Sequence, residues 1–143
     1  RLAGKALTLG DDFLCTHPAR IERAIAAGAA DALLLKVNQV GTLTGARSVV
    51  EIAKEAGYAT VLSARSGETE DAWLADLAVG WRTGQIKVGS TMRSERTAKW
   101  NRLLRIEAER PDAVFAARAA LAPVSISSRP RSPISRPTRI AVS

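Results

Sequence analysis

Residues 32–36 read Ala-Leu-Leu-Leu-Lys, an unbroken apolar run that ends in a charged residue. Short continuous apolar runs are typical of strands that are buried on both faces of a parallel sheet. Three more apolar runs precede a charged residue in the same way, namely Lys5–Leu9 before Asp11, Ala59–Ser63 before Arg65, and Gln85–Ile86 before Lys87. The quoted stretch is therefore predicted to be the second of four parallel strands.

The charged residues at these strand ends follow one another at intervals of 25, 29 and 22 positions. Such an interval accommodates one strand, one helix and two loops. Because parallel strands joined by helices all end at the same edge, the charged side chains are expected to converge on one site. The predicted fold class is α/β, as a partial (β/α)8 TIM-type barrel of about four βα units.

Helix signals occupy the segments between the predicted strands. Pro18 follows Thr16 and His17 at a helix start, and Gly28 is expected to end that helix. Residues 38–41 are predicted to form a loop. The second helix is expected to start at Thr42 or Thr44 and to stop at Gly57. A third helix is expected from Thr69 through Trp81, and a fourth from about Ser94 to Glu109.

The length and composition indicate one globular domain with a tail. The 143 residues are too few for a complete eight-stranded barrel, which takes about 250. We assign residues 1–110 to the barrel portion and residues 111–143 to a tail rich in Pro, Ser and Arg, which is predicted to be disordered. Because Arg1 is followed almost at once by a predicted strand, we expect further sequence upstream.

The formal charge of +7 is concentrated near the C-terminus, where residues 122–143 contain four arginines and no acidic residue. A balanced body with a basic tail argues against a folded nucleic-acid-binding surface, although the tail itself could retain RNA. Cys15 is the single cysteine, so no intrachain disulfide can form, which fits a reducing, cytoplasmic location. No apolar stretch approaches the ~18 residues of a membrane span.

The strand-end residues form a chemically coherent set. Asp11 and Asp12 offer hard oxygen ligands for a divalent cation such as Mg²⁺. Lys36 follows an apolar strand, where partial burial favours a neutral amine that can act as a base. Arg65 offers a planar fork that matches phosphate or carboxylate. With Lys87 as a second cation, the set suits an anionic substrate that forms an enolate.

Each of these residues also has a purely structural interpretation. Asp11 and Asp12 follow Gly10 as they would in a turn. Lys36 could be a solvated strand end, and residues 65–67 could be an ordinary polar loop balanced by nearby glutamates. The shared position at strand ends is what favours the chemical interpretation.

Four stretches of the chain resemble enolases, which are phosphopyruvate hydratases. The resemblance runs from about Gly4 to Glu109 and covers only the C-terminal barrel portion of an enolase. The stretches are Leu34-Leu-Lys-Val-Asn-Gln-Val-Gly-Thr-Leu43, Ser63-Ala-Arg-Ser-Gly-Glu-Thr-Glu-Asp71, Gly84-Gln-Ile-Lys-Val-Gly89, and Lys99-Trp-Asn-Arg-Leu-Leu-Arg-Ile-Glu107. Two shorter matches are Arg93-Ser-Glu-Arg96 and Gly10-Asp-Asp12 with Thr16 and Pro18, the second of which resembles the segment that bears the last metal-binding carboxylate of enolases.

The resemblance implies a Mg²⁺-dependent carbon–oxygen lyase of glycolysis that dehydrates 2-phosphoglycerate to phosphoenolpyruvate in the cytoplasm. It implies that Lys36 is the catalytic base and that Asp11 is a metal ligand. The residues that it implies for substrate binding are Asp11, Lys36, Ser63, Arg65, Ser66 and Lys87.

Two departures from the enolase pattern affect the expected activity. Ala64 stands where the family has a histidine. The other two metal carboxylates of the family, the acid that expels hydroxide and the N-terminal domain are expected upstream of this chain. We therefore predict that the isolated chain is inactive and that it self-associates or is completed by an N-terminal part. The alternative is a non-catalytic, enolase-derived half-barrel that acts as a binding or structural module.

Overall fold

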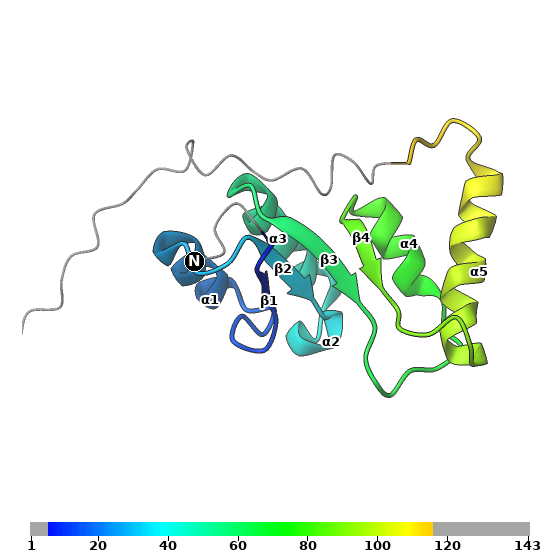
Figure 1. Cartoon of the computed structure of the whole chain (residues 1–143), viewed down its shortest axis with the longest axis horizontal. Helices are drawn as coiled ribbons and strands as arrows, with labels where there is room; N and C mark the ends of the chain where they lie inside the picture. The colour runs from blue at the N-terminus through cyan, green and yellow to red at the C-terminus, as the bar shows by residue number, and fades with distance from the viewer. Residues whose placement is uncertain (1–5, 116–143) are drawn as a thin grey trace, which may run out of the picture.

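The computed structural model describes residues 6–115, which form a four-stranded sheet with helices between the strands. The strands lie side by side in chain order, and every neighbouring pair is parallel (Figure 1). The predicted α/β class is confirmed.

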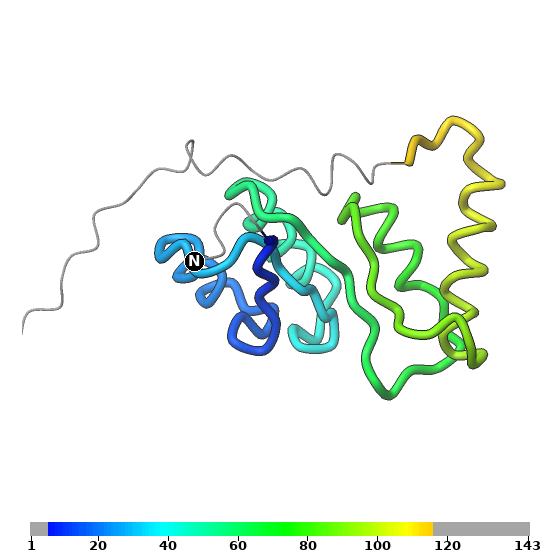
Figure 2. The backbone as a smooth tube through the Cα atoms, in the orientation of Figure 1, coloured from blue at the N-terminus to red at the C-terminus, as the bar shows by residue number. Residues whose placement is uncertain are grey.

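Strands and helices alternate along the chain, and each strand-helix unit lies beside the one before it (Figure 2). The elements are β1 (Leu9–Gly10), α1 (Pro18–Ala27), β2 (Ala32–Leu35), α2 (Val37–Val40), α3 (Leu43–Glu55), β3 (Ala59–Ser63), α4 (Trp73–Gly80), β4 (Gly84–Lys87) and α5 (Ser94–Glu109).

Several predicted helix boundaries are confirmed, and each has a local cause. Pro18 is the first residue of α1, where its fixed φ favours the helix and its missing N–H costs nothing. Gly28 ends α1 with a left-handed φ of 58°. Thr42 caps α3, because its hydroxyl oxygen accepts the Gly45 N–H at 3.1 Å.

The apolar core lies between the sheet and the helices that cover one of its faces. Helix α3 packs on β2 and β3, α1 packs on α3, and α4 packs on β3 and β4. All four residues of β2 are buried, as the unbroken apolar run predicts. The fully buried contributors to this core include Ile21, Leu33, Leu35, Val49, Ala53 and Leu62.

The first strand is shorter than predicted. It comprises Leu9 and Gly10, whereas Lys5 lies outside the described residues. Ahead of it, the Thr8 N–H donates to the Asp31 carboxylate at 3.1 Å and is therefore not free for a strand partner. The paired ladder accordingly starts one residue later, at Leu9 opposite Ala32.

Residues 38–41, predicted as a loop, belong largely to the short helix α2. The Gln39 N–H donates to the Lys36 carbonyl at 2.9 Å, and the Gly41 N–H donates to the Val37 carbonyl at 3.1 Å. Gly41 then adopts a φ of 86°, which ends the turn. The loop prediction is wrong because one helical turn without an apolar repeat leaves no sequence signal.

Helix α4 starts four residues later than the predicted cap at Thr69. The residue that receives the first helical N–H is Asp71, whose Oδ1 accepts the Trp73 N–H at 3.0 Å. The carbonyls of Thr69 and Asp71 accept hydrogen bonds from the Lys99 side chain of α5 instead of continuing a helix. A distant residue therefore sets this boundary.

The two edges of the described sheet are β1 and β4. The last strand spans Gly84–Lys87, which extends the predicted run Gln85–Ile86 by one residue at each end, and α5 has the predicted bounds. The division at residue 110 stays a prediction, and most of the tail assigned to residues 111–143 lies outside the described residues.

Candidate active site

The ends of β2, β3 and β4 are aligned in one row. Ser63 pairs with Lys87, and Leu35 pairs with Leu62, so that Lys36 follows in the same row as Ser63. Neighbours in one row of a parallel sheet point to the same face. Lys36, Ser63 and Lys87 thus share one face, whereas Leu35 and Leu62 point into the helix-covered core.

Lys36 lies at the end of the buried strand β2, and its side chain is only 11% exposed. Its Nζ donates to Oδ1 of Asp11 and also lies 3.4 Å from Oδ1 of Asp12. The segment after β1 thus brings two carboxylates to the amine that ends β2. This places two of the predicted site residues, Asp11 and Lys36, in direct contact.

The backbone of Lys36 is held by Thr16, a buried residue in the turn before α1. The Lys36 N–H donates to the Thr16 hydroxyl oxygen at 3.0 Å, and that hydroxyl donates to Oε1 of Gln39 at 2.7 Å. Cys15 and Thr16 both adopt left-handed φ angles, of 49° and 47°. Such angles are uncommon for residues other than glycine. This turn directs the Thr16 hydroxyl at the start of α2.

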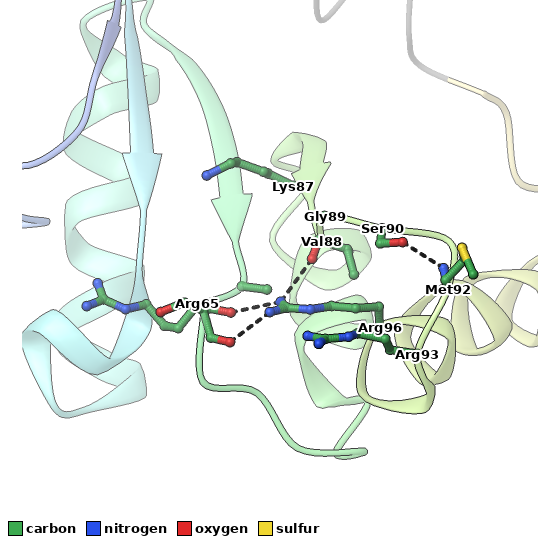
Figure 3. A pocket seen from close by; sticks show the side chains of 10 residues that line it. Arg65, Lys87, Val88, Gly89, Ser90, Met92, Arg93 and Arg96 are labelled. Atoms are coloured by element: carbon green, nitrogen blue, oxygen red, sulfur yellow. Dashed lines mark hydrogen bonds between the residues drawn. The ribbon is translucent and has the colours of Figure 1, made fainter.

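A second group of predicted residues lies around a pocket of about 610 Å³ between the β3–α4 and β4–α5 loops. Arg65 and Lys87 extend from it to the same side, toward β2, while Arg93 and Arg96 lie on the other side (Figure 3). The pocket lining contains no acidic residue. Its lining is Ala64, Arg65, Ser66, Lys87, Val88, Gly89, Ser90, Met92, Arg93 and Arg96.

The predicted site residues thus form two groups at the carboxyl edge of the sheet. One group joins Asp11 to Lys36, and the other brings Arg65 and Ser66 next to Lys87. Ser63 connects the groups by register, although its own hydroxyl donates to the Ala64 carbonyl at 2.8 Å. Within residues 6–115, no hydrogen bond or ion pair joins the side chains of the two groups directly.

Ala64 lines the pocket and packs against the apolar core. Its N–H donates to the Lys87 carbonyl at 2.9 Å, which extends the β3–β4 ladder by one residue. A methyl side chain at this position offers a bound ligand neither a donor nor an acceptor. The position can therefore contribute shape to the pocket but no polar contact.

Sequence reasoning gave no individual role to three charged residues that surround the Arg65–Ser66 segment. Lys99 of α5 is 1% exposed and forms an ion pair with Glu68 at 2.9 Å. Arg96, one helical turn earlier, donates to the carbonyls of Arg65 and Ser66. The available signal was the spacing of Arg96 and Lys99, which puts two cations on one helix face.

The carboxyl group of Glu68 has a pKa that departs from its ordinary value. Burial alone would raise the pKa of this carboxyl, but the Arg65 N–H and the Lys99 ammonium both donate to it. The positive charges of Lys99 and Arg96 act in the same direction. The net result is a pKa below the ordinary value of 4.5, so Glu68 is ionised at neutral pH.

The carboxylates predicted to bind magnesium are those of Asp11 and Asp12. Mg²⁺ prefers octahedral coordination by oxygen and is usually bound by one or two carboxylates together with water or substrate oxygens. Between residues 6 and 115 there is no group of three or more His, Cys, Asp or Glu side chains that could hold a metal ion. Asp11 is already engaged by Lys36, so its assignment as a metal ligand stays a prediction.

The helices of the described segment are all too short or too polar to cross a membrane.

A family model for the enolase C-terminal TIM barrel domain matches residues 1–123. This chain belongs to the enolase family. The match includes the whole predicted region from Gly4 to Glu109 and extends beyond it. With this family assignment, the four parallel strands and their helices are a segment of the enolase barrel, which confirms the predicted partial TIM-type barrel. The edge with Lys36 and Lys87 is the carboxyl edge of that barrel segment, where TIM-barrel enzymes have their sites.

Proposed function

We propose that this chain carries the base and the phosphate-binding edge of an enolase-type site, whose reaction converts 2-phosphoglycerate to phosphoenolpyruvate. One observation supports this more than any other. Lys36 is nearly buried beside Asp11, and it lies in the same row of the sheet as Ser63 and Lys87. A proton acceptor, a hydroxyl and a second cation therefore face the same side. The glycolytic role and the cytoplasmic location are part of this proposal.

The reaction removes a proton from carbon 2 and hydroxide from carbon 3, while the C–H electron pair becomes the new double bond. In our proposal, the Lys36 ammonium, which donates to Asp11, first releases one proton to solvent and leaves that carboxylate. The lone pair on Nζ then accepts the proton from carbon 2. Negative charge then accumulates on the substrate carboxylate. Lys87 is proposed to stabilise it, because a cation fixed beside developing charge lowers the barrier.

The phosphate group is proposed to bind at the β3–α4 loop. Arg65 presents a fork of donors that fits phosphate oxygens, and Ser66 adds a hydroxyl. Both residues are exposed and line the cationic pocket with Lys87. Ser63 is proposed as a further substrate contact from the end of β3.

Magnesium would supply positive charge at the substrate carboxylate when it is bound. We propose that Asp11 contributes one ligand and that other acidic side chains are required, because residues 6–115 contain no metal-binding group of three. The chain on its own is therefore proposed to bind substrate without turning it over.

A second candidate function is a non-catalytic binding module. It is favoured by Ala64, which lacks the polar side chain of the family histidine, and by the incomplete acidic set of the described residues. This alternative covers a binding or a structural module, and it differs from the first candidate because turnover cannot be restored by adding the missing acidic residues.

The binding claim is tested by calorimetric titration with 2-phosphoglycerate. Lys87→Gln should weaken binding about tenfold, since it removes a charge-assisted contact. The matched control is Arg47→Gln, which removes one positive charge from α3 at a side chain that is 67% exposed. Equal affinity of Lys87→Gln and wild type would contradict the proposal.

The turnover claim is tested by the absorbance of phosphoenolpyruvate. The isolated chain with Mg²⁺ should form none above background. Turnover that disappears in Lys36→Ala would overturn the proposed inactivity and establish the enzyme. Turnover that appears only after a chain with further carboxylates is added would exclude the binding-module alternative.

We also propose that the strand edges β1 and β4 pair with further strands, from a second copy or from an N-terminal part. Among the described residues no further strand lies beside β1 or β4, and the open edge of a sheet promotes association with another strand. Light scattering should show species larger than one chain, and a stable monomer at high concentration would contradict this.

A further inference from the structure

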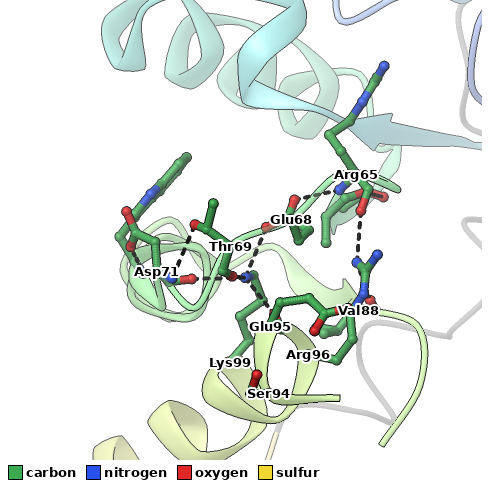
Figure 4. Close-up of polar contacts among 12 residues, drawn as sticks. Arg65, Glu68, Thr69, Asp71, Val88, Ser94, Glu95, Arg96 and Lys99 are labelled. Carbon is green, nitrogen blue, oxygen red and sulfur yellow. Dashed lines mark hydrogen bonds and ion pairs between the residues drawn. The ribbon is translucent and has the colours of Figure 1, made fainter. Parts of the chain in front are cut away.

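Lys99 is a fully buried cation on a helix that is otherwise poorly buried. It is the one residue of α5 that is buried among those of Ser94–Glu109. Its Nζ forms an ion pair with Oε2 of Glu68 at 2.9 Å and donates to the carbonyls of Thr69, Asp71 and Glu95, each at 2.9 Å (Figure 4). A buried ammonium is tolerated only with such a full set of partners. The partners here come mainly from the β3–α4 loop.

Glu68 links this buried cation to Arg65. One carboxylate oxygen of Glu68 pairs with Lys99, and the other accepts the Arg65 N–H at 2.6 Å. The Glu68 side chain is 18% exposed, so water competes little for these contacts. The position of the Arg65 peptide therefore depends on a residue 34 positions later in the chain.

Arg96 holds the backbone of the same residue, Arg65, at its carbonyl oxygen. Its Nη1 donates to the carbonyls of Arg65 at 2.8 Å and Val88 at 3.0 Å, and its Nη2 donates to the carbonyl of Ser66 at 2.9 Å. Three of the five donors of this guanidinium are thus used on backbone oxygens. Arg96 lines the pocket, but its guanidinium donors bind backbone carbonyls of the β3–α4 loop and of Val88, directly after β4.

We propose that Glu68, Arg96 and Lys99 form a charged clamp that positions the Arg65–Ser66 segment for binding an anionic ligand. The clamp fixes the Arg65 backbone at both its N–H and its C=O, and it leaves the Arg65 guanidinium free to extend toward β2 (Figure 3). These three are positioning residues, because they contact the backbone of the binding segment. The anion is the phosphate of the proposed function, on which this inference rests.

Charged side chains suit this clamp better than apolar ones. The Arg65–Ser66 segment is exposed, so it has no apolar side chain with which to pack on α5. A planar guanidinium and an ammonium can each bind several carbonyls at once, which fixes a loop with few residues. Replacing either cation should leave the sheet intact and release the loop.

The test uses Arg96, which is only partly buried, so that folding is preserved. Arg96→Met removes all three carbonyl contacts, whereas Arg96→Lys keeps the charge but not the planar fork. The matched control is Arg105→Met, which removes the same charge from an exposed position of α5. Two quantities are measured on the full chain: the dissociation constants of sulfate and 2-phosphoglycerate, and the amide exchange rates of residues 65–68.

Arg96→Met is expected to weaken binding of both ligands about tenfold and to accelerate loop exchange about tenfold, with Arg96→Lys between it and wild type. Arg105→Met should change neither. Unchanged affinity and unchanged exchange in folded Arg96→Met would overturn the clamp. A wild type that binds neither ligand, together with faster loop exchange in Arg96→Met, would overturn the proposed function and leave the loop-positioning role standing.

Discussion

The two halves of the molecule share one apolar core but differ in how their outer helices are held. The first half, from β1 through α3, is organised around fully buried apolar residues such as Ile21, Leu35 and Val49. In the second half, α5 lies against α4 and buries Lys99, whose four partners are all oxygen atoms. Apolar burial is non-directional, whereas charged hydrogen bonds fix geometry. The proposed base, Lys36, therefore lies on the half with the larger apolar core, and the proposed phosphate segment lies on the half where charged contacts position the loop.

The largest expected effect comes from removing the buried charge of the second half. Lys99→Met keeps a similar length but leaves Glu68 and three carbonyls without their donor, which costs about 4 kcal/mol. Hydrogen exchange should show lost protection in residues 64–72 and α5, with β2 and α3 still protected. Uniform loss of protection would show that the two halves are not separable.

A core substitution in the first half should have a slightly smaller but global effect. Leu35→Ala creates a cavity beneath β2, where the side chain is fully buried, and should cost about 3 kcal/mol. The urea midpoint is expected to fall for every probe at once. A midpoint shift confined to the probes of β2 would contradict the view that this half forms the common core.

Acid should loosen the second half selectively. The Glu68 carboxyl has a folded-state pKa below 4.5, because the donations from Arg65 and Lys99 and the charges of Lys99 and Arg96 outweigh its burial. Its stabilisation is thus complete above pH 4.5 and is lost as the pH falls through the folded-state pKa. Amide exchange at Arg65, corrected for intrinsic rates, should accelerate in that window.

Glu68→Gln supplies the control for this pH dependence, since it retains an oxygen for the Arg65 N–H but cannot titrate. Its loop exchange should be faster than that of wild type at neutral pH and should change less in acid. An equally steep acid response in Glu68→Gln would assign the effect to other carboxylates.

The smallest expected effect is at the cap of α3. Thr42→Ala removes the hydroxyl that accepts the Gly45 N–H and should cost about 1 kcal/mol. Thermal unfolding should shift by a few degrees, with no change in ligand affinity. A change in 2-phosphoglycerate binding would mean that the α2–α3 junction influences the site.

The sequence predicted the strand order and the strand-end residues because each depends on local pattern. The run Ala32–Leu35 has no polar residue to face solvent, which favours a parallel strand covered on both faces, and the residue after such a strand lies at the carboxyl edge. Pro18 and Gly28 marked a helix by their own backbone preferences. The same reasoning predicted that Asp11 and Lys36 converge on one edge of the sheet, where Lys36 donates to Asp11.

The parts that the sequence did not predict depend on contacts between distant residues. Thr69 has the side chain of a good helix cap, but Lys99 binds its carbonyl and α4 starts later. The charged clamp of Glu68, Arg96 and Lys99 joins two loops and a helix, and no local pattern encodes such a meeting. Contacts of this kind become visible only when the fold has brought α5 against the β3–α4 loop.

The central claim is that parallel strand ends deliver Lys36 and the Arg65–Ser66 segment to one ligand. Titration of ¹⁵N-labelled chain with 2-phosphoglycerate tests it directly. We predict that the amides of Lys36 and Ser66 shift together, with one dissociation constant. Shifts confined to residues 65–66, or two different constants for the two groups, would contradict the claim.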